Sequence, residues 1–188
     1  MRQIGILGGT FDPPHLGHLL IAEQVKEALS LDEVWFIPTN EPPHKTNAMT
    51  PSKHRVIMLQ KAIQGNDDFH IKTIELERAG KSYTIDTIKQ LKRRYENVQF
   101  HFIIGADMVN YLDRWYQIDE LIKHVQFVGV ERPGYVCETS HPVTIVDIPL
   151  IDISSTDIRR RLKTNASIRY LTPSSVQQYI KEMNLYDT

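Results

Sequence analysis

The 188-residue sequence is 41% hydrophobic and 24% charged, which is ordinary for a globular protein with a substantial core. Its formal net charge of −1 gives no overall attraction to nucleic acid or an anionic membrane, and we expect neither as a partner. The single cysteine excludes an intramolecular disulfide framework, and no apolar run approaches the ~20 residues that span a bilayer, so we expect a cytoplasmic protein.

The first expected element is a buried strand at Gln3–Leu7, followed by a turn and a helix. The turn reads Gly8-Gly9-Thr10-Phe11-Asp12-Pro13-Pro14-His15-Leu16-Gly17-His18, and apolar residues then recur at helical spacing as far as Leu29. Two histidines therefore stand at a helix N-terminus, where N–H groups and the helix dipole favour anions. The glycines let a ligand approach the backbone, and the pattern favours a polyphosphate site.

This turn matches neither of two common phosphate-binding patterns. It lacks the Gly-x-x-x-x-Gly-Lys-Ser/Thr run of a P-loop, and its glycines do not form the dinucleotide-binding fingerprint. Two alternatives stay open: a structural turn rich in glycine and proline, and half of a zinc site on His15 and His18. A zinc ion needs three or four ligands, and nothing nearby in the sequence completes the set.

Strand-like and helix-like runs alternate along the remaining chain. We expect strands at 33–37, 69–72, 99–104, 126–130 and 144–148, and helices at 53–63, 85–95, 119–124, 156–163 and 174–183. This alternation predicts an α/β fold with a doubly wound, mainly parallel sheet covered by helices on both faces. Ligands bind such sheets beyond the carboxyl ends of the strands, so the turns at 8–18 and 105–107 are expected to share one crevice.

Local signals mark where helices start and where a loop has a function. The Thr-Pro pairs at 50–51 and 172–173 predict threonine N-caps, and either Ser154 or Ser155 is expected to cap the helix after it. The polar connection 39–50 contains Pro42-Pro43-His44-Lys45, and its length favours a functional lid over a plain linker.

Two segments carry a resemblance to a known family. His15-Leu16-Gly17-His18 resembles the His-x-Gly-His element of the nucleotidyltransferases related to class I aminoacyl-tRNA synthetases. Ile153-Ser154-Ser155-Thr156-Asp157-Ile158-Arg159 resembles their Ile-Ser-Ser-Thr-x-Ile-Arg motif. The two elements stand about 140 residues apart in the family's order, and the resemblance extends almost to the C-terminus. Within the family, the sequence is most similar to the bacterial nicotinate-mononucleotide adenylyltransferase branch.

The resemblance implies a reaction and an architecture. An adenylyl group would pass from ATP to nicotinate mononucleotide, giving nicotinate adenine dinucleotide and pyrophosphate in NAD synthesis. Mg²⁺ is the implied cofactor, bound mainly through substrate phosphates and without a dedicated protein metal site. The implied fold is a Rossmann-like nucleotidyltransferase domain over 1–188, in which the helical part at about 154–188 completes the ATP site. The oligomeric state stays open, with a homodimer among the alternatives.

On the ATP side, the resemblance implies that His15, His18 and Arg159 are catalytic, as donors to phosphate oxygens rather than as nucleophiles. Ser155 and Arg159 are four residues apart, so a helix places them on one face, while the arginines at 160 and 161 face solvent. Ile158 is expected to point into the core. The implied ATP-binding set is Gly8, Gly9, Thr10, Phe11, His15, His18, Gly105, Asp107, Ser155, Thr156, Ile158 and Arg159.

On the acceptor side, the resemblance implies that five residues bind nicotinate mononucleotide: His44, Lys45, Thr84, Trp115 and Tyr116. Trp115 would stack on the pyridine ring, and backbone N–H groups after it would bind the carboxylate. Plain alternatives stay open: His44 as a solvated loop charge, Thr84 as an N-cap and Trp115 as core packing.

Other functions are disfavoured by particular features. The segments around Lys45, Thr84 and Trp115 argue against a sibling pantetheine-phosphate or cytidylyl transferase on the same scaffold. The two histidines together with Arg159 argue against a module that senses ATP without turning it over. An aminoacyl-tRNA synthetase is disfavoured because the second motif lacks the lysine-rich form and the chain is nearly neutral.

Overall fold

The computed structural model describes residues 1–40, 50–78, 80, 82–130, 139–149 and 151–186. Within these residues, six parallel strands form one sheet in the order β3-β2-β1-β4-β5-β6. This is the doubly wound order, so the predicted α/β fold is confirmed. The strands are β1 (Arg2–Gly9), β2 (Glu33–Pro38), β3 (Phe69–Ile71), β4 (Val98–Gly105), β5 (Gln126–Val130) and β6 (Val143–Val146).

The described helices follow the predicted ranges closely, with short additions between β4 and β5. The longer helices are α1 (Leu16–Ala28), α2 (Ser52–Ala62), α3 (Thr84–Arg94), α6 (Ser155–Lys163) and α7 (Ser174–Glu182). The short ones are α4 (Ala106–Val109), the 3₁₀ turn η1 (Leu112–Arg114) and α5 (Ile118–Leu121). The sequence analysis missed α4 and η1 because three or four residues are too few to show a helical period.

The sheet is buried on both faces. In β2, Val34 and Phe36 join the apolar cluster that contains α1, whereas Trp35 and Ile37 join the cluster that contains α3. Successive side chains of a strand point to opposite faces, so a strand buried on both sides needs an unbroken apolar run. This explains why the strands read as continuous apolar segments rather than as alternating ones.

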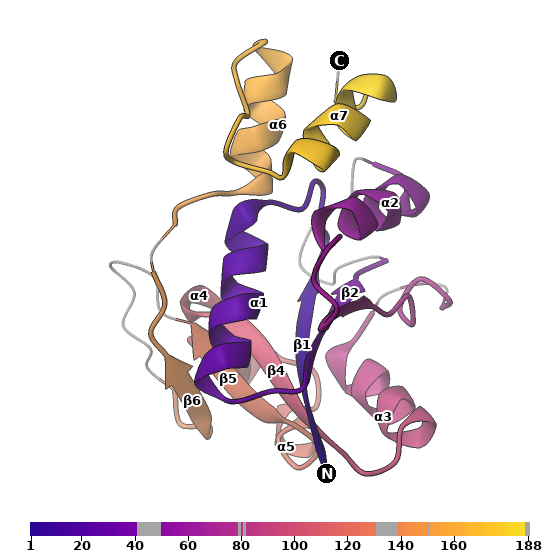
Figure 1. The fold of residues 1–188 in the computed structure, drawn as a ribbon. Coiled ribbons are helices and arrows are strands. Elements are labelled where there is room, and N and C mark those ends of the chain that lie inside the picture. Colours follow the sequence, from indigo (N-terminus) through magenta and orange to yellow (C-terminus); the bar gives the residue numbers. More distant parts are fainter. Residues whose placement is uncertain (41–49, 79, 81, 131–138, 150, 187–188) are drawn as a thin grey trace.

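A third apolar cluster joins α2 to the two C-terminal helices. Met58 of α2, Ile158 of α6 and Val176 of α7 are fully buried in it. Figure 1 shows α6 and α7 beyond the end of α1 from which the loop leads back to β1, close to α2. The third cluster therefore packs α6 and α7, near the C-terminus, close to the loop that joins β1 and α1.

Two of the predicted helix caps are wrong and one is confirmed. The N-caps of α2 and α7 are Pro51 and Pro173 rather than the threonines before them. Thr172 instead directs its hydroxyl to Pro14, which explains why it does not cap α7. Ser154 does cap α6, because its hydroxyl accepts the N–H of Asp157 at 3.1 Å. None of the described helices is both long and apolar enough to cross a membrane.

Candidate active site

The predicted turns meet where the strand order reverses. β1 pairs with β2 on one side and with β4 on the other, so the connections leave their carboxyl ends in opposite directions. Gly8 and Gly9 end β1, and Gly105 ends β4 and caps α4. Asp107 is exposed in the first turn of α4. The strand order therefore places the two turns at the switch point of the sheet, where a shared crevice was predicted.

Phe11 fixes the course of the loop after β1. Its φ of 51° lies in the left-handed region, and its ring is 1% exposed and packs edge-on to the His18 ring at 4.9 Å. A Cβ on Gly9 would lie 3.1 Å from the Phe11 ring, so glycine gives this ring its space. Phe11 thus anchors the loop in the core.

His15 and His18 form a stacked pair at the start of α1. Their ring centroids are 3.6 Å apart, and the backbone N–H of His15 donates to Nδ1 of His18 at 3.1 Å. Because Nδ1 of His18 accepts, the proton of its neutral ring is on Nε2, which makes Nε2 the donor atom of this side chain.

Gly17 is the glycine of the His-x-Gly-His element, and the structure gives this position a packing role beside the histidine pair. A Cβ at this buried position would lie 3.0 Å from Nδ1 of His15. This distance is shorter than an ordinary van der Waals contact, so a larger residue would push the His15 ring out of its stack. The glycine therefore shapes the histidine pair rather than touching the expected ligand.

The expectation of open N–H groups at the start of α1 needs a correction. The N–H of Leu16 donates to the Leu171 carbonyl at 3.0 Å, and the N–H of His18 donates to the His15 carbonyl at 3.0 Å. Together with the N–H of His15, which donates to Nδ1 of His18, three of the four donors at this helix start are therefore used within the protein. The bond from Leu16 also ties α1 to the segment before α7.

Side chains from distant elements bond four carbonyl groups of the loop. A buried carbonyl must find a donor, and Pro13 and Pro14 have no N–H groups with which to form a regular turn. The donors come from α2, from α6 and from the residue before Pro173. We call them the carbonyl clamp: Arg55 to Thr10 at 2.7 Å, Arg159 to Asp12 at 2.7 Å, Ser155 to Pro13 at 2.8 Å and Thr172 to Pro14 at 2.7 Å.

The clamp joins the two motifs that are far apart in the sequence. Ser155 and Arg159 lie on one face of α6, as predicted, and both face the loop. The second guanidinium nitrogen of Arg159 donates to the Thr156 hydroxyl at 3.3 Å. Ile158 points into the core, as predicted, with no exposed surface.

The neighbouring arginines behave differently from Arg159. Arg160 and Arg161 both pair with Asp157, and Nε of Arg161 lies 2.7 Å from a carboxylate oxygen. These bonds, first that from Arg161, hold the pKa of Asp157 below its usual value. The two arginines are thus part of a surface ion-pair cluster on Asp157 rather than merely solvated.

Arg55 is a site residue that the sequence analysis missed. It is 2% exposed, and burial lowers its pKa. Besides Thr10, its guanidinium donates to the Thr39 carbonyl at 2.9 Å and to the Thr50 carbonyl at 3.2 Å. A signal was present, because residue 55 shares the helical stripe of the apolar residues 58, 59 and 62, where a charged residue is unusual.

The described acceptor-side residues also come together. Thr84 is the first residue of α3, and Tyr83 takes the N-cap position, so the alternative that Thr84 is an N-cap is excluded. The Tyr83 ring lies 4.7 Å from the ring of Tyr116, which is 54% exposed. This aromatic contact places Thr84 beside the turn at 115–117. His44 and Lys45 lie outside the described residues.

Most of the Trp115 side chain packs in the core, but its one polar atom, the indole nitrogen, forms no hydrogen bond with the described residues. Its ring meets Phe102 and Phe127 edge to face, each at 5.8 Å, so the core-packing alternative describes part of this side chain. Its indole N–H is buried and finds no acceptor among the described residues. A buried indole N–H usually has a partner, so this atom is suited to a ligand.

A buried carboxylate supports the start of α3. Glu75 is 8% exposed and accepts the Thr87 hydroxyl at 2.8 Å, and Arg78 donates to the same hydroxyl at 2.5 Å. Desolvation raises the pKa of Glu75 above its usual value. Asn40, just after β2, donates to the Arg78 carbonyl at 3.0 Å. This network ties the segment before α3 to the carboxyl end of β2.

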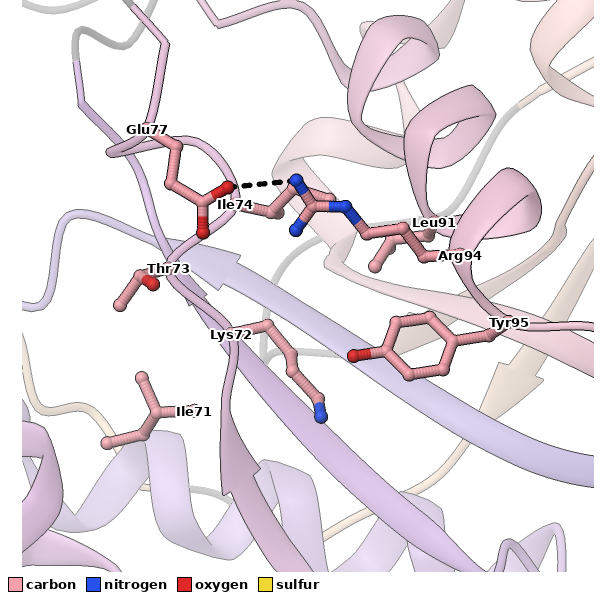
Figure 2. A pocket seen from close by; sticks show the side chains of 8 residues that line it. All are labelled: Ile71, Lys72, Thr73, Ile74, Glu77, Leu91, Arg94 and Tyr95. Carbon is pink, nitrogen blue, oxygen red and sulfur yellow. Dashed lines mark hydrogen bonds and ion pairs between the residues drawn. The ribbon is translucent and has the colours of Figure 1, made fainter.

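A separate hollow of about 150 Å³ lies beside β3 and α3. Figure 2 shows it between the Glu77–Arg94 ion pair and the side chains of Lys72 and Tyr95. Nζ of Lys72 lies 4.2 Å from the centre of the Trp35 ring. None of the predicted site residues lines this hollow.

The fold and the two joined motifs define the class of the protein as a nucleotidyltransferase. The family model that matches residues 6–161, most of the chain, is described as cytidylyltransferase-like. This agrees with the position of the histidine pair at the switch point of the sheet.

Comparison with known proteins narrows the class. A probable nicotinate-nucleotide adenylyltransferase from Oceanobacillus iheyensis is 57% identical over 186 residues, covering 99% of this chain and 97% of the relative. The nicotinate-nucleotide adenylyltransferase from Bacillus subtilis is 51% identical over 189 residues, covering 100% of both chains. The chain belongs to the nicotinate-nucleotide adenylyltransferase family.

Solved structures agree on the fold. The nicotinic acid mononucleotide adenylyltransferase of Plasmodium falciparum in complex with NaAD has a TM-score of 0.84 at 23% identity, covering 100% of this chain and 98% of that chain. At this identity the likeness shows the shared fold alone.

Proposed function

We propose that this protein transfers the adenylyl group of ATP to nicotinate mononucleotide. A phosphate oxygen of the mononucleotide attacks the α-phosphorus of ATP, a new P–O bond forms, and the bond to the β-phosphate oxygen breaks. The products are nicotinate adenine dinucleotide and pyrophosphate. The observation that carries the proposal is the carbonyl clamp, since Ser155 and Arg159 lie against the loop that leads to His15 and His18. Full-length relatives that are named for this activity support the choice of substrates.

The chemistry asks the protein mainly to position groups and to stabilise charge. Nε2 of His18 would donate to a phosphate oxygen on which charge develops, and His15 would act beside it from the stacked pair. Arg159 would hold the leaving phosphates, because a planar guanidinium can bond two oxygens at once. The bond that Arg159 donates to the Asp12 carbonyl would hold its guanidinium in place before ATP arrives.

A divalent cation, Mg²⁺, would enter with ATP. Within the described residues, no three His, Cys, Asp or Glu side chains gather as a metal site. The carboxylate of Asp12, which is part of the loop, accepts the Tyr186 hydroxyl. The described residues therefore do not fit a protein cage for Mg²⁺, which would be held by phosphate oxygens and water.

The acceptor would lie between the start of α3 and the turn at 115–117. Tyr116 is exposed, and its ring contacts that of Tyr83, the residue before Thr84. The buried indole N–H of Trp115 would donate to the mononucleotide. The N–H of Ile118 donates to the Trp115 carbonyl at 3.2 Å, so it is not a donor for the nicotinate carboxylate. The candidates for that bond narrow to the N–H groups of Tyr116, Gln117 and Asp119.

The direct test is incubation of the purified protein with ATP and nicotinate mononucleotide. We expect nicotinate adenine dinucleotide and pyrophosphate in equal amounts, measured by liquid chromatography and a pyrophosphate assay. Phosphopantetheine in place of the mononucleotide, and CTP in place of ATP, are the controls for the sibling activities. Absence of the dinucleotide, or a preference for either control substrate, would contradict the proposal.

A further inference from the structure

One tyrosine of the C-terminal segment contacts the loop between β1 and α1. Tyr186 is 9% exposed, and its hydroxyl donates to a carboxylate oxygen of Asp12 at 2.5 Å. The backbone of Tyr186 has a φ of 71°, in the left-handed region that a bulky residue rarely adopts. Such a conformation persists where the surrounding packing holds it, which here is the apolar cluster of α2, α6 and α7.

Asp12 connects this tyrosine to the expected phosphate-binding groups. Asp12 is 2% exposed, and its carbonyl accepts the Arg159 guanidinium at 2.7 Å. It stands three residues before His15 in a loop whose other carbonyls are also clamped. A shift of Asp12 would therefore displace the carbonyl that Arg159 bonds. It would also displace the loop residues that lead to His15 and His18.

The tyrosine keeps its role as donor across the working pH range. Burial, together with the negative charge of Asp12, raises the pKa of Tyr186 far above its usual value. A buried carboxylate needs donors, and a hydrogen bond to a charged acceptor is stronger than one between neutral groups. The positive charge of Arg55 also attracts the Asp12 carboxylate. The hydrogen bonds of its guanidinium, however, go to three backbone carbonyls.

We propose that Tyr186 is a positioning residue that fixes Asp12 and, through it, sets Arg159 and the His15–His18 pair for phosphate binding. The effect on catalysis rests on the proposed function, whereas the effect on the loop does not. Tyr186 touches no substrate in this account and acts through the loop alone.

The test compares Tyr186→Phe with a matched control, Tyr179→Phe. Tyr179 lies in the same apolar cluster and is 8% exposed, but its hydroxyl bonds Nδ1 of His54 at 2.8 Å rather than the loop. In the full-length protein without ligand, we expect hydrogen exchange of the peptide covering 10–18 to become faster in Tyr186→Phe and to stay unchanged in Tyr179→Phe. Thermal denaturation checks that both variants are folded.

Kinetics supply the second measurement. We expect Tyr186→Phe to lower kcat about tenfold with little change in the KM for nicotinate mononucleotide, since displaced donors act on the transition state. Tyr179→Phe should keep the kcat of the wild type. Equal effects of the two variants on kcat would mean that loss of a buried hydroxyl acts only through general stability, and this would overturn the proposal.

A double-mutant cycle with Asp12→Asn measures the coupling between Tyr186 and Asp12 directly. The amide oxygen of asparagine still accepts a hydrogen bond but carries no charge, so the effect of Tyr186→Phe on exchange should be smaller in this background. Additive effects, or unchanged exchange in Tyr186→Phe, would refute the coupling. Faster exchange in a protein with no adenylyl transfer would instead refute the proposed function and leave the coupling standing.

Discussion

The two sides of the site are held by different kinds of interaction. On the phosphate side, side chains from α2, α6 and the segment before α7 bond four carbonyls of one loop, so residues far apart in the sequence determine its shape. On the acceptor side, a ring contact between Tyr83 and Tyr116 and the buried Glu75 network hold the start of α3. The phosphate side is thus fixed by directional hydrogen bonds at backbone atoms, whereas the acceptor side depends more on aromatic packing.

This difference fits the two tasks. Phosphate oxygens need several donors in a fixed geometry, and small displacements of such donors cost much of the rate. A pyridine ring needs an apolar surface and a few polar atoms that set its orientation. Changes on the phosphate side should therefore lower kcat, and changes on the acceptor side should alter binding, specificity or local stability.

The largest expected effect comes from His18→Ala. Loss of one donor to charge that develops in the transition state typically lowers the rate by about 10²–10³. We expect kcat to fall by this amount and the KM for ATP to change much less, in steady-state assays of folded protein. Nearly wild-type kcat would remove His18 from the mechanism and would break the assignment of the phosphate side.

A smaller effect is expected for Arg159→Lys. A lysine presents a point charge and cannot bond the Asp12 carbonyl and a phosphate with the geometry of a guanidinium. We expect a folded protein whose activity is lower by at least roughly tenfold, about 1.4 kcal/mol. The control is Arg161→Ala, which removes only a surface partner of Asp157 and should be nearly silent. Similar losses in both variants would mean that the Arg159 guanidinium has no special role among the arginines of α6.

The smallest expected effect concerns stability on the acceptor side. The raised pKa of Glu75 means that the folded protein binds this proton more tightly than the unfolded chain. Its contribution to stability is therefore present below the ordinary glutamate pKa and declines as pH rises through the raised value. Glu75→Gln removes this decline, so the variant should gain unfolding free energy relative to the wild type as pH rises above the ordinary glutamate pKa.

Urea unfolding at several pH values measures this trend. Glu77→Gln is the control, because Glu77 is two residues away but forms an exposed ion pair with Arg94, and it should keep the pH trend of the wild type. The contrary result would be a difference in unfolding free energy between Glu75→Gln and the wild type that stays constant with pH, or that shifts in favour of the wild type as pH rises. Either result would show that burial does not oppose ionisation of the Glu75 carboxylate.

The sequence predicted the fold and the two motifs because their signals are local. Apolar periodicity located the longer helices and the strands, and the spacing of Ser155 and Arg159 placed both on one face of α6. The glycines at 8, 9 and 105 indicated that the expected site lies at the carboxyl ends of β1 and β4.

The parts that escaped prediction depend on tertiary contacts. The bond from Tyr186 to Asp12 spans 174 residues, and nothing in the pattern around either residue indicates it. Thr172 looks like a helix cap in the sequence, but in the structure its hydroxyl finds the Pro14 carbonyl. Gly17 matters because of the His15 ring packed against it, a contact that spacing alone does not reveal. Buried polar groups need partners, but only the fold decides which ones they meet.

The most direct measurement of the central claim is the ratio of kcat/KM for nicotinate mononucleotide and nicotinamide mononucleotide. A hydrogen bond to a charged group contributes about 1.5–3 kcal/mol, against 0.5–1.5 for a neutral one, and an amide would leave one backbone donor near Trp115 unpaired. The account predicts a preference for the acid of at least roughly a hundredfold in kcat/KM. Comparable values for the two mononucleotides would contradict both the acceptor pocket between α3 and the turn at 115–117 and the proposed substrate.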